Sequence, residues 1–108
     1  MIISSRNDLS GHRIVEEFGL VRGSTIRARH LGRDILAGLK SVVGGEIQEY
    51  TKMMAESREQ AIDRMEREAA DLGANAILCV RFSTAYVMGG TAEIVVYGTA
   101  VRVEKDEA

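Results

Sequence analysis

The densest group of residues that could do chemistry is a basic cluster at Arg27, Arg29, His30 and Arg33. Guanidinium groups hold phosphate and carboxylate groups through paired hydrogen bonds, and a helix that starts after Gly32 would add backbone N–H donors. This pattern is compatible with a site for a small anion. The alternative is that Arg27 and Arg29 pair with an acidic helix later in the chain, and the absence of a glycine-rich phosphate loop favours this alternative.

Metal binding has three candidate ligands besides carboxylates, namely Cys79, His12 and His30. They form no CxxC, HxH or HExxH arrangement, so a site within one chain would draw its ligands from three distant places. Cys79 also lies among Ile77 and Val80, where a lone thiol is typical of a small buried hydrophobic residue. A heavy-metal site at Cys79, with His30 as a second ligand, is therefore an alternative hypothesis.

Catalytic chemistry has no comparable pattern. Ser, His and Asp occur, but no nucleophile elbow of the GxSxG type links them. The adjacent carboxylates Glu16 and Glu17 would point to opposite faces of a strand. We therefore assign no catalytic residue.

Two charged residues, Arg81 and Glu93, interrupt segments that are otherwise apolar. Burying a charge is costly unless the charge is paired. Arg81 and Glu93 are therefore predicted to pair with each other or to line a cavity at an interface.

The elements that must position these residues follow from periodicity. Helical spacing predicts a long amphipathic helix over Glu46–Leu72 and a short helix over Asp34–Val43. Alternation and β-branched residues predict three strands, the last two joined through Gly89-Gly90: Ile14–Ile26, Ala76–Thr84 and Thr91–Val103. The sequence thus predicts an α+β fold in which a small antiparallel sheet of about three strands packs on one long and one short helix.

The last two strands are apolar on both faces. Over Thr91–Val103, Val95, Tyr97 and Val101 alternate with Ile94 and Val96. Two helices supply one covering layer, so the second face needs another cover. Copies of the same chain in a closed ring would provide it, and a segment of the same chain folded across that face is the alternative.

Composition sets the broad class. The chain has 108 residues, which fits a single domain over residues 1–108, and its net charge of −2 gives no general attraction to nucleic acid or to a membrane surface. One cysteine, no membrane-length apolar run and no secretion signal favour the cytoplasm. Basic residues outnumber acidic ones over residues 1–40, whereas acidic residues dominate 46–72, so these two regions suit mutual pairing.

Several blocks of the sequence, in a fixed order, resemble the YbjQ-like proteins. The longest is GRDILAGLKSVVGGEIQEY from Gly32 to Tyr50; the others are Gly23–Thr25, Arg27–Arg29, Arg64-Met65, Leu72–Ala76, Val80–Phe82 and Tyr97–Val101. The resemblance implies a small bacterial subunit, similar to the dodecin-like fold, that assembles as a homopentamer. It implies no established function, because the family carries only the label "putative heavy-metal-binding domain".

The resemblance also singles out polar positions that match the family pattern. They are candidates for a shared site or for the ion pairs that hold a pentamer together: Arg29, Arg33, Asp34, Lys40, Glu46, Tyr50, Arg81 and Glu93. Two positions depart from the pattern, since Cys79 stands where a small residue such as Gly is common and Ser83 stands where Asp is common.

Together these observations predict a cytoplasmic homo-oligomer that binds a small anionic ligand at subunit interfaces without catalysis. Four residues are the predicted ligand contacts: Arg29, Arg33, Tyr50 and Arg81. Four more form the predicted polar framework: Asp34, Lys40, Glu46 and Glu93. The alternatives are heavy-metal binding through Cys79 and His30, and a purely structural oligomer.

Overall fold

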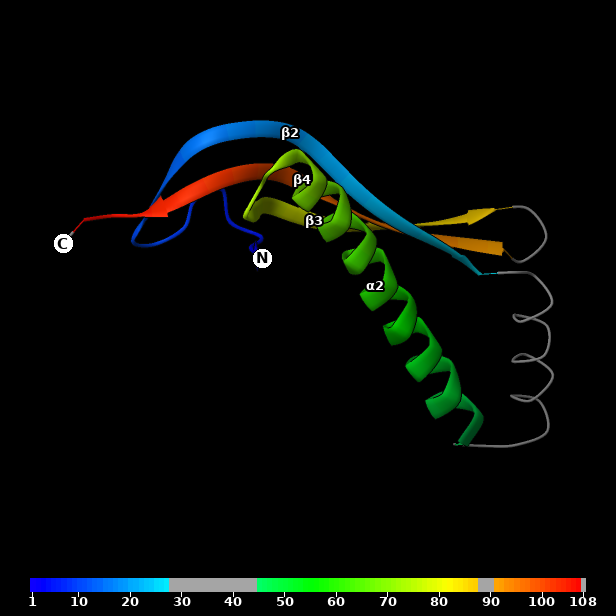
Figure 1. Cartoon of the computed structure of the whole chain (residues 1–108). Coiled ribbons are helices and arrows are strands. Elements are labelled where there is room, and N and C mark those ends of the chain that lie inside the picture. Colours follow the sequence, from blue (N-terminus) through cyan, green and yellow to red (C-terminus); the bar gives the residue numbers. More distant parts are fainter. Residues whose placement is uncertain (28–44, 88–90, 108) are drawn as a thin grey trace.

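The computed structural model describes residues 1–27, 45–87 and 91–107, with the backbone alone at 27, 45–51, 86, 87 and 91. One helix lies against a curved sheet (Figure 1). The strands follow the order β1-β3-β4-β2 across the sheet. The elements are β1 (Ile2–Ile3), β2 (His12–Arg27), α2 (Gly45–Leu72), β3 (Ala76–Val87) and β4 (Thr91–Lys105).

The predicted long helix and the three predicted strands are confirmed, and each strand is longer than expected. The sheet itself was predicted incorrectly, because it has four strands and is mixed. Strand β1 pairs parallel to β3, with Ile2 opposite Ala76, whereas β4 is antiparallel to both of its neighbours. A strand of two residues is too short to show the alternation of apolar and polar side chains, so β1 could not be predicted from the sequence. The predicted helix over 34–43 and the Gly89-Gly90 turn lie outside the described residues.

Helix α2 ends in a left-handed glycine cap. Gly73 has φ 94°, its N–H donates to Ala70 O at 3.0 Å, and the N–H of Ala74 donates to Ala69 O at 3.1 Å. These two bonds form a Schellman motif, in which Ala74 and Ala69 also share the core. Among the described residues, no helix combines the length and the hydrophobicity that crossing a membrane requires.

The main core lies between the C-terminal half of α2 and the sheet face beneath it, here called the helix face. Alanines dominate the helix side, and Gly23 lies at the crossing on the sheet side, so the two backbones approach closely there. A β-carbon on Gly23 of β2 would overlap the carbonyl O of Ala61 and lie 2.6 Å from Met65 N. The buried members are Val21, Ala61, Met65, Ala69, Ala74, Ile77, Val96 and Ala100.

The other side of the sheet, here called the opposite face, is covered over only part of its length. At one end Leu9, from the segment after β1, packs on a second buried cluster: Ala76, Leu78, Val101 and Val103. Toward the other end, Leu20 and Ile26 are each 65% exposed and Tyr97 is 38% exposed. The prediction of two apolar faces is thus confirmed, and the chain covers part of the second face itself.

Ion pairs along the sheet join β2 to β4. Arg13 bonds to Glu104 at 2.8 Å and Arg102 bonds to Glu16 at 2.6 Å, and each pair lies directly across the two strands. Each such half-exposed pair contributes about 0.2–1 kcal/mol, enough to favour this register. The predicted pairing of residues 1–40 with the acidic helix does not occur at Arg13, whose carboxylate partner lies on β4.

The close approach at Gly23 gives a sharp test. Replacing Gly23→Ala should destabilise the fold by about 3 kcal/mol or more, because two backbones must separate to admit one methyl group. Gly19→Ala is the matched control on the same strand. At Gly19, φ is 98° and nothing lies within 4 Å, so only left-handed strain of about 1–2 kcal/mol is expected. Urea unfolding of both variants measures the difference, and equal losses would contradict the contact described above.

Candidate functional site

The predicted site residues fall into three groups. Arg29, His30, Arg33, Asp34 and Lys40 lie outside the described residues. Glu46 and Tyr50 lie in the first turns of α2, where the backbone alone is described. Three are described with their side chains: Cys79, Arg81 and Glu93.

Arg81 does not pair with Glu93, so the first of the two predicted alternatives is wrong. Arg81 lies opposite Tyr97, whereas Glu93 lies opposite Ala85, four residues farther along β4. Nor is Arg81 buried. Its Nη1 donates to the carbonyl O of Ser5 at 2.8 Å and to that of Val80 at 2.9 Å. The backbone of the N-terminal segment, and not a carboxylate, therefore holds this guanidinium.

Register brings Arg81 into a row with two residues that the sequence prediction missed. Tyr97 on β4 lies opposite Arg22 on β2 and opposite Arg81 on β3. Residues directly across neighbouring strands share a face, so all three side chains project from the opposite face. All three are exposed. We call Arg22, Tyr97 and Arg81 the arginine–tyrosine row.

The rows on either side of the arginine–tyrosine row contain no carboxylate. One consists of Leu20, Thr99 and Leu78, and the other of Ser24, Val95 and Ser83. Glu93 lies two rows away, which at about 3.4 Å per strand residue is roughly 14 Å along β4. Among the described residues, the row therefore carries two positive charges with no acidic side chain in the adjoining rows of the sheet.

Alternation along a strand could have placed Tyr97 on one face, since the period of 2 is visible in the sequence. It could not have identified the neighbours of Tyr97, because register depends on a β-bulge. Between Leu78 and Arg81 strand β3 carries one residue more than β4. A bulge of this kind has no reliable pattern in a single sequence.

Cys79 lies at this bulge and adopts φ 57°, in the left-handed region that favours glycine. Its N–H donates to Arg6 O at 2.9 Å, and its side chain packs beside the cluster that Leu9 covers. The thiol is free and partly buried. Within the described part of the chain, no group of three or more His, Cys, Asp or Glu side chains is arranged to hold a metal ion.

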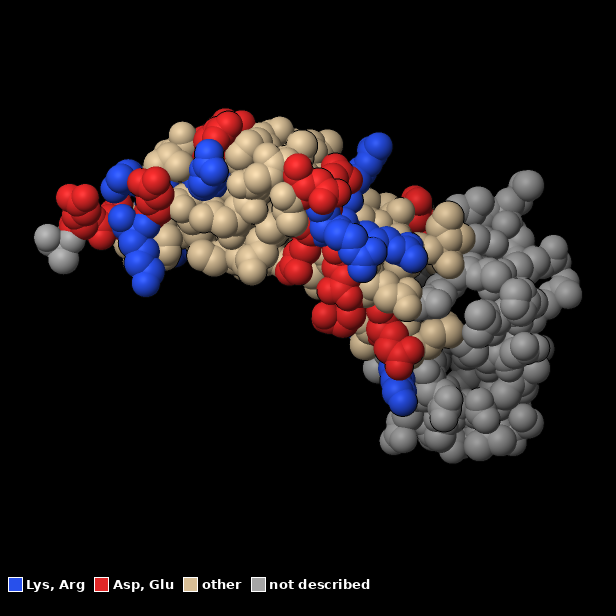
Figure 2. Space-filling view, viewed as in Figure 1, with Lys and Arg blue, Asp and Glu red and all other residues tan. Residues whose placement is uncertain are grey.

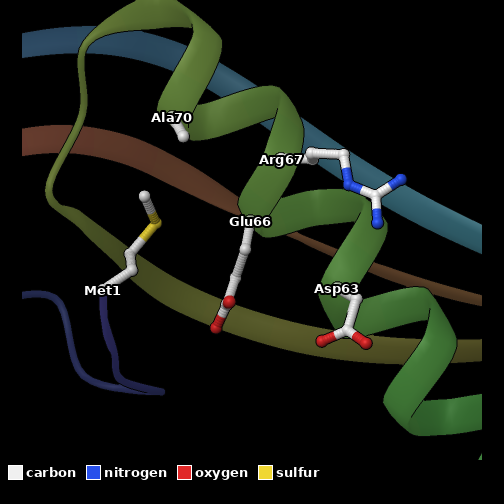
Figure 3. Close-up of a pocket in the computed structure, with 5 residues that line it drawn as sticks. All are labelled: Met1, Asp63, Glu66, Arg67 and Ala70. Atoms are coloured by element: carbon white, nitrogen blue, oxygen red, sulfur yellow. The ribbon is translucent and has the colours of Figure 1, made fainter.

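Figure 2 shows acidic side chains along α2 with basic ones among them, and the described part of this helix lines two shallow hollows. One, of about 470 Å³, is lined by Met1, Asp63, Glu66, Arg67 and Ala70. Figure 3 shows Glu66 and Asp63 extending from one side of the helix while Arg67 extends in another direction. The other hollow, of about 460 Å³, combines Lys52 with three carboxylates: Glu56, Glu59 and Asp63. Carboxylates outnumber cations in both linings, which disfavours an anion there, whereas the arginine–tyrosine row carries two cations.

Comparison with known proteins identifies the family. The model of the YbjQ family, described as "Putative heavy-metal-binding", matches residues 1–104. This chain belongs to that family. The YbjQ relatives include a UPF0145 protein of Dehalococcoides mccartyi, 60% identical over 96% of this chain and 100% of its own length. Another, from Thermus thermophilus, is 54% identical over 96% of this chain and 91% of its own length.

The family is not confined to bacteria, as the resemblance had implied. The UPF0145 protein of the archaeon Methanosarcina acetivorans is 53% identical over 95% of this chain and 97% of its own length. Among solved structures, a protein of unknown function from Pediococcus pentosaceus matches with a TM-score of 0.61. It is 17% identical and covers 96% of this chain and 98% of its own, so it supports the fold alone.

The backbone at Cys79 predicts an unusual order of stability. In an ordinary strand, glycine is less stable than alanine by about 0.5–1 kcal/mol. At φ 57° the β-carbon of alanine costs about 1–2 kcal/mol, so Cys79→Gly should be more stable than Cys79→Ala by about 0.5–1 kcal/mol. Thermal or urea unfolding of the two variants measures this difference. If Cys79→Ala proved the more stable, the left-handed conformation at this position would be wrong.

Proposed function

We propose that this protein is a non-catalytic binding protein whose site takes a small anionic ligand on the opposite face of the sheet. The observation that supports this proposal is the arginine–tyrosine row: two exposed guanidinium groups flank one tyrosine, with no carboxylate in the adjoining rows. Arg29, Arg33 and Tyr50 remain candidate contacts on sequence grounds.

The spacing of the two arginines suits one shared anion. Their strands are separated by β4, so their Cα atoms lie about 10 Å apart across two strand spacings. Arginine side chains are long enough to converge on one anion held beside the tyrosine ring. Charge-assisted hydrogen bonds from arginine to phosphate or carboxylate are about twice as strong as neutral ones, so two converging guanidinium groups favour an anion.

We propose further that the protein works as a homo-oligomer, as the family resemblance implies, with five dodecin-like subunits in the cytoplasm. The radius of gyration is 17.6 Å, against about 13 Å for a compact domain of this length. Exposed apolar side chains occur on both faces, with Leu20 and Ile26 on the opposite face and Phe82, 47% exposed, beside the helix. Packing of neighbouring copies would cover this surface and set the anion site at a subunit interface.

Anion binding can be tested with inorganic phosphate. Arg22→Gln and Arg81→Gln should each weaken phosphate binding at least about tenfold, because each removes a charge-assisted contact. Arg13→Gln is the matched control, since it removes one arginine from β2 that is paired with Glu104 outside the row. Titration calorimetry or NMR titration measures the affinities. Equal binding by all four proteins would rule out this site.

The family description keeps heavy-metal binding as a second candidate, with Cys79 as the thiol ligand and His30 as its partner. Native mass spectrometry of the purified protein addresses assembly and metal content together. We expect a pentamer of 11.8 kDa subunits. Metal in a fixed ratio that disappears in Cys79→Ala would support the metal site, whereas unchanged metal content in that variant would exclude it. A bare monomer would contradict the oligomer.

A further inference from the structure

We infer that the anionic ligand also carries an aromatic ring, and that the site takes a phosphorylated aromatic molecule of the nucleoside monophosphate type. This inference rests on the proposed anion site and adds a ligand class to it. The observation that supports this inference is the position of Tyr97, whose ring lies at the centre of the row and not at its edge.

Tyr97 is placed to bind and not simply to fill the core. The main core lies on the other side of the sheet, and Tyr97 is 38% exposed in a chain with only three Tyr, two Phe and no Trp. An exposed aromatic ring on a sheet offers a flat surface on which a base can stack. The flanking arginines would then bind the phosphate that the ribose of such a nucleotide carries beside the ring.

The two arginines differ in a way that suits a ligand with a fixed orientation. Nη1 of Arg81 is held by the carbonyls of Ser5 and Val80, so this guanidinium is positioned before any ligand arrives. Nη2 and Nε of Arg81 make no hydrogen bond with a described residue. The side chain of Arg22 makes no hydrogen bond or ion pair with any residue that the structure describes. One cation is thus preorganised and the other is free to close on the ligand.

The next row along the sheet contains the groups that a sugar would need. Ser24 and Ser83 lie on either side of Val95, one row away from the arginines and on the same face. That separation is about 7 Å, close to the distance between a base and the hydroxyls of its ribose. Serine hydroxyls both donate and accept hydrogen bonds, so they can meet those hydroxyls without adding charge.

A single nucleotide fits this face better than a nucleic acid strand. Proteins that bind single strands stack successive bases on several aromatic side chains along a basic groove. Here one aromatic ring lies between the two arginines, and Leu20 and Ile26 extend the β2 side of this face as apolar residues. The net charge of the chain is −2, which gives no general attraction to a nucleic acid strand.

The test compares three probes on the full chain by titration calorimetry: AMP, ribose 5-phosphate and adenosine. AMP should bind at least about tenfold more tightly than either of the others, because ribose 5-phosphate lacks the stacking ring and adenosine lacks the charge. Equal binding of AMP and ribose 5-phosphate would overturn the aromatic ligand while leaving the anion site intact. Binding of none of the three, together with no binding of inorganic phosphate, would overturn the proposed function as well.

Variants of Tyr97 separate the ring from the rest of the site. Tyr97→Phe keeps the ring and should keep the preference for AMP over ribose 5-phosphate, whereas Tyr97→Leu should abolish that preference and retain binding of ribose 5-phosphate. If Tyr97→Leu does not fold, the comparison of probes on the unaltered chain still decides. A preference that persists in Tyr97→Leu would place the ring contact elsewhere. A ten-nucleotide single strand that binds far more tightly than AMP would identify nucleic acid as the ligand instead.

Discussion

The contact on which the rest of the structure depends is the approach of two backbones where α2 crosses β2. Gly23 has no side chain, so the helix at Ala61 and Met65 packs directly on the strand. Beside this crossing, Thr25 Oγ1 donates to Ser57 O at 3.3 Å, and Arg64 donates to the carbonyl of Ser24. The steric fit at Gly23 and these two hydrogen bonds fix the distance of the helix from the sheet and its direction. A larger side chain at Gly23 would push α2 and β2 apart and break both hydrogen bonds.

One consequence is the uneven covering of the sheet. A helix held close to β2 and β4 leaves Phe82 on β3 partly exposed, and no second helix among the described residues covers the opposite face. The N-terminal segment shields one end of that face through Leu9. The remaining area is where the arginine–tyrosine row lies, so the same geometry that forms the core also leaves the candidate site open.

The sequence predicts the parts of this fold that depend on local patterns. The spacing of Ala61, Met65 and Ala69 identifies α2 and its buried side, and alternation identifies the three long strands and their two apolar faces. It does not reveal β1, which is too short for a pattern. Nor does it reveal which residues meet across strands, since register depends on the bulge in β3 and on contacts far apart in the chain. The alternative in which Arg81 pairs with Glu93 was wrong for this reason, and Arg22 and Tyr97 were missed as site residues.

The bulge at Cys79 has an effect that reaches beyond its own backbone. Side chains on a strand alternate, and the bulge uses one residue of β3 without advancing the pairing with β4. With the same sequence but no bulge, Val80 would lie opposite Tyr97 and Arg81 would point toward the helix. The bulge thus decides whether this end of β3 presents a cation or an aliphatic side chain to the ligand, and a relative that lacked residue 79 would keep the cation there on a regular strand.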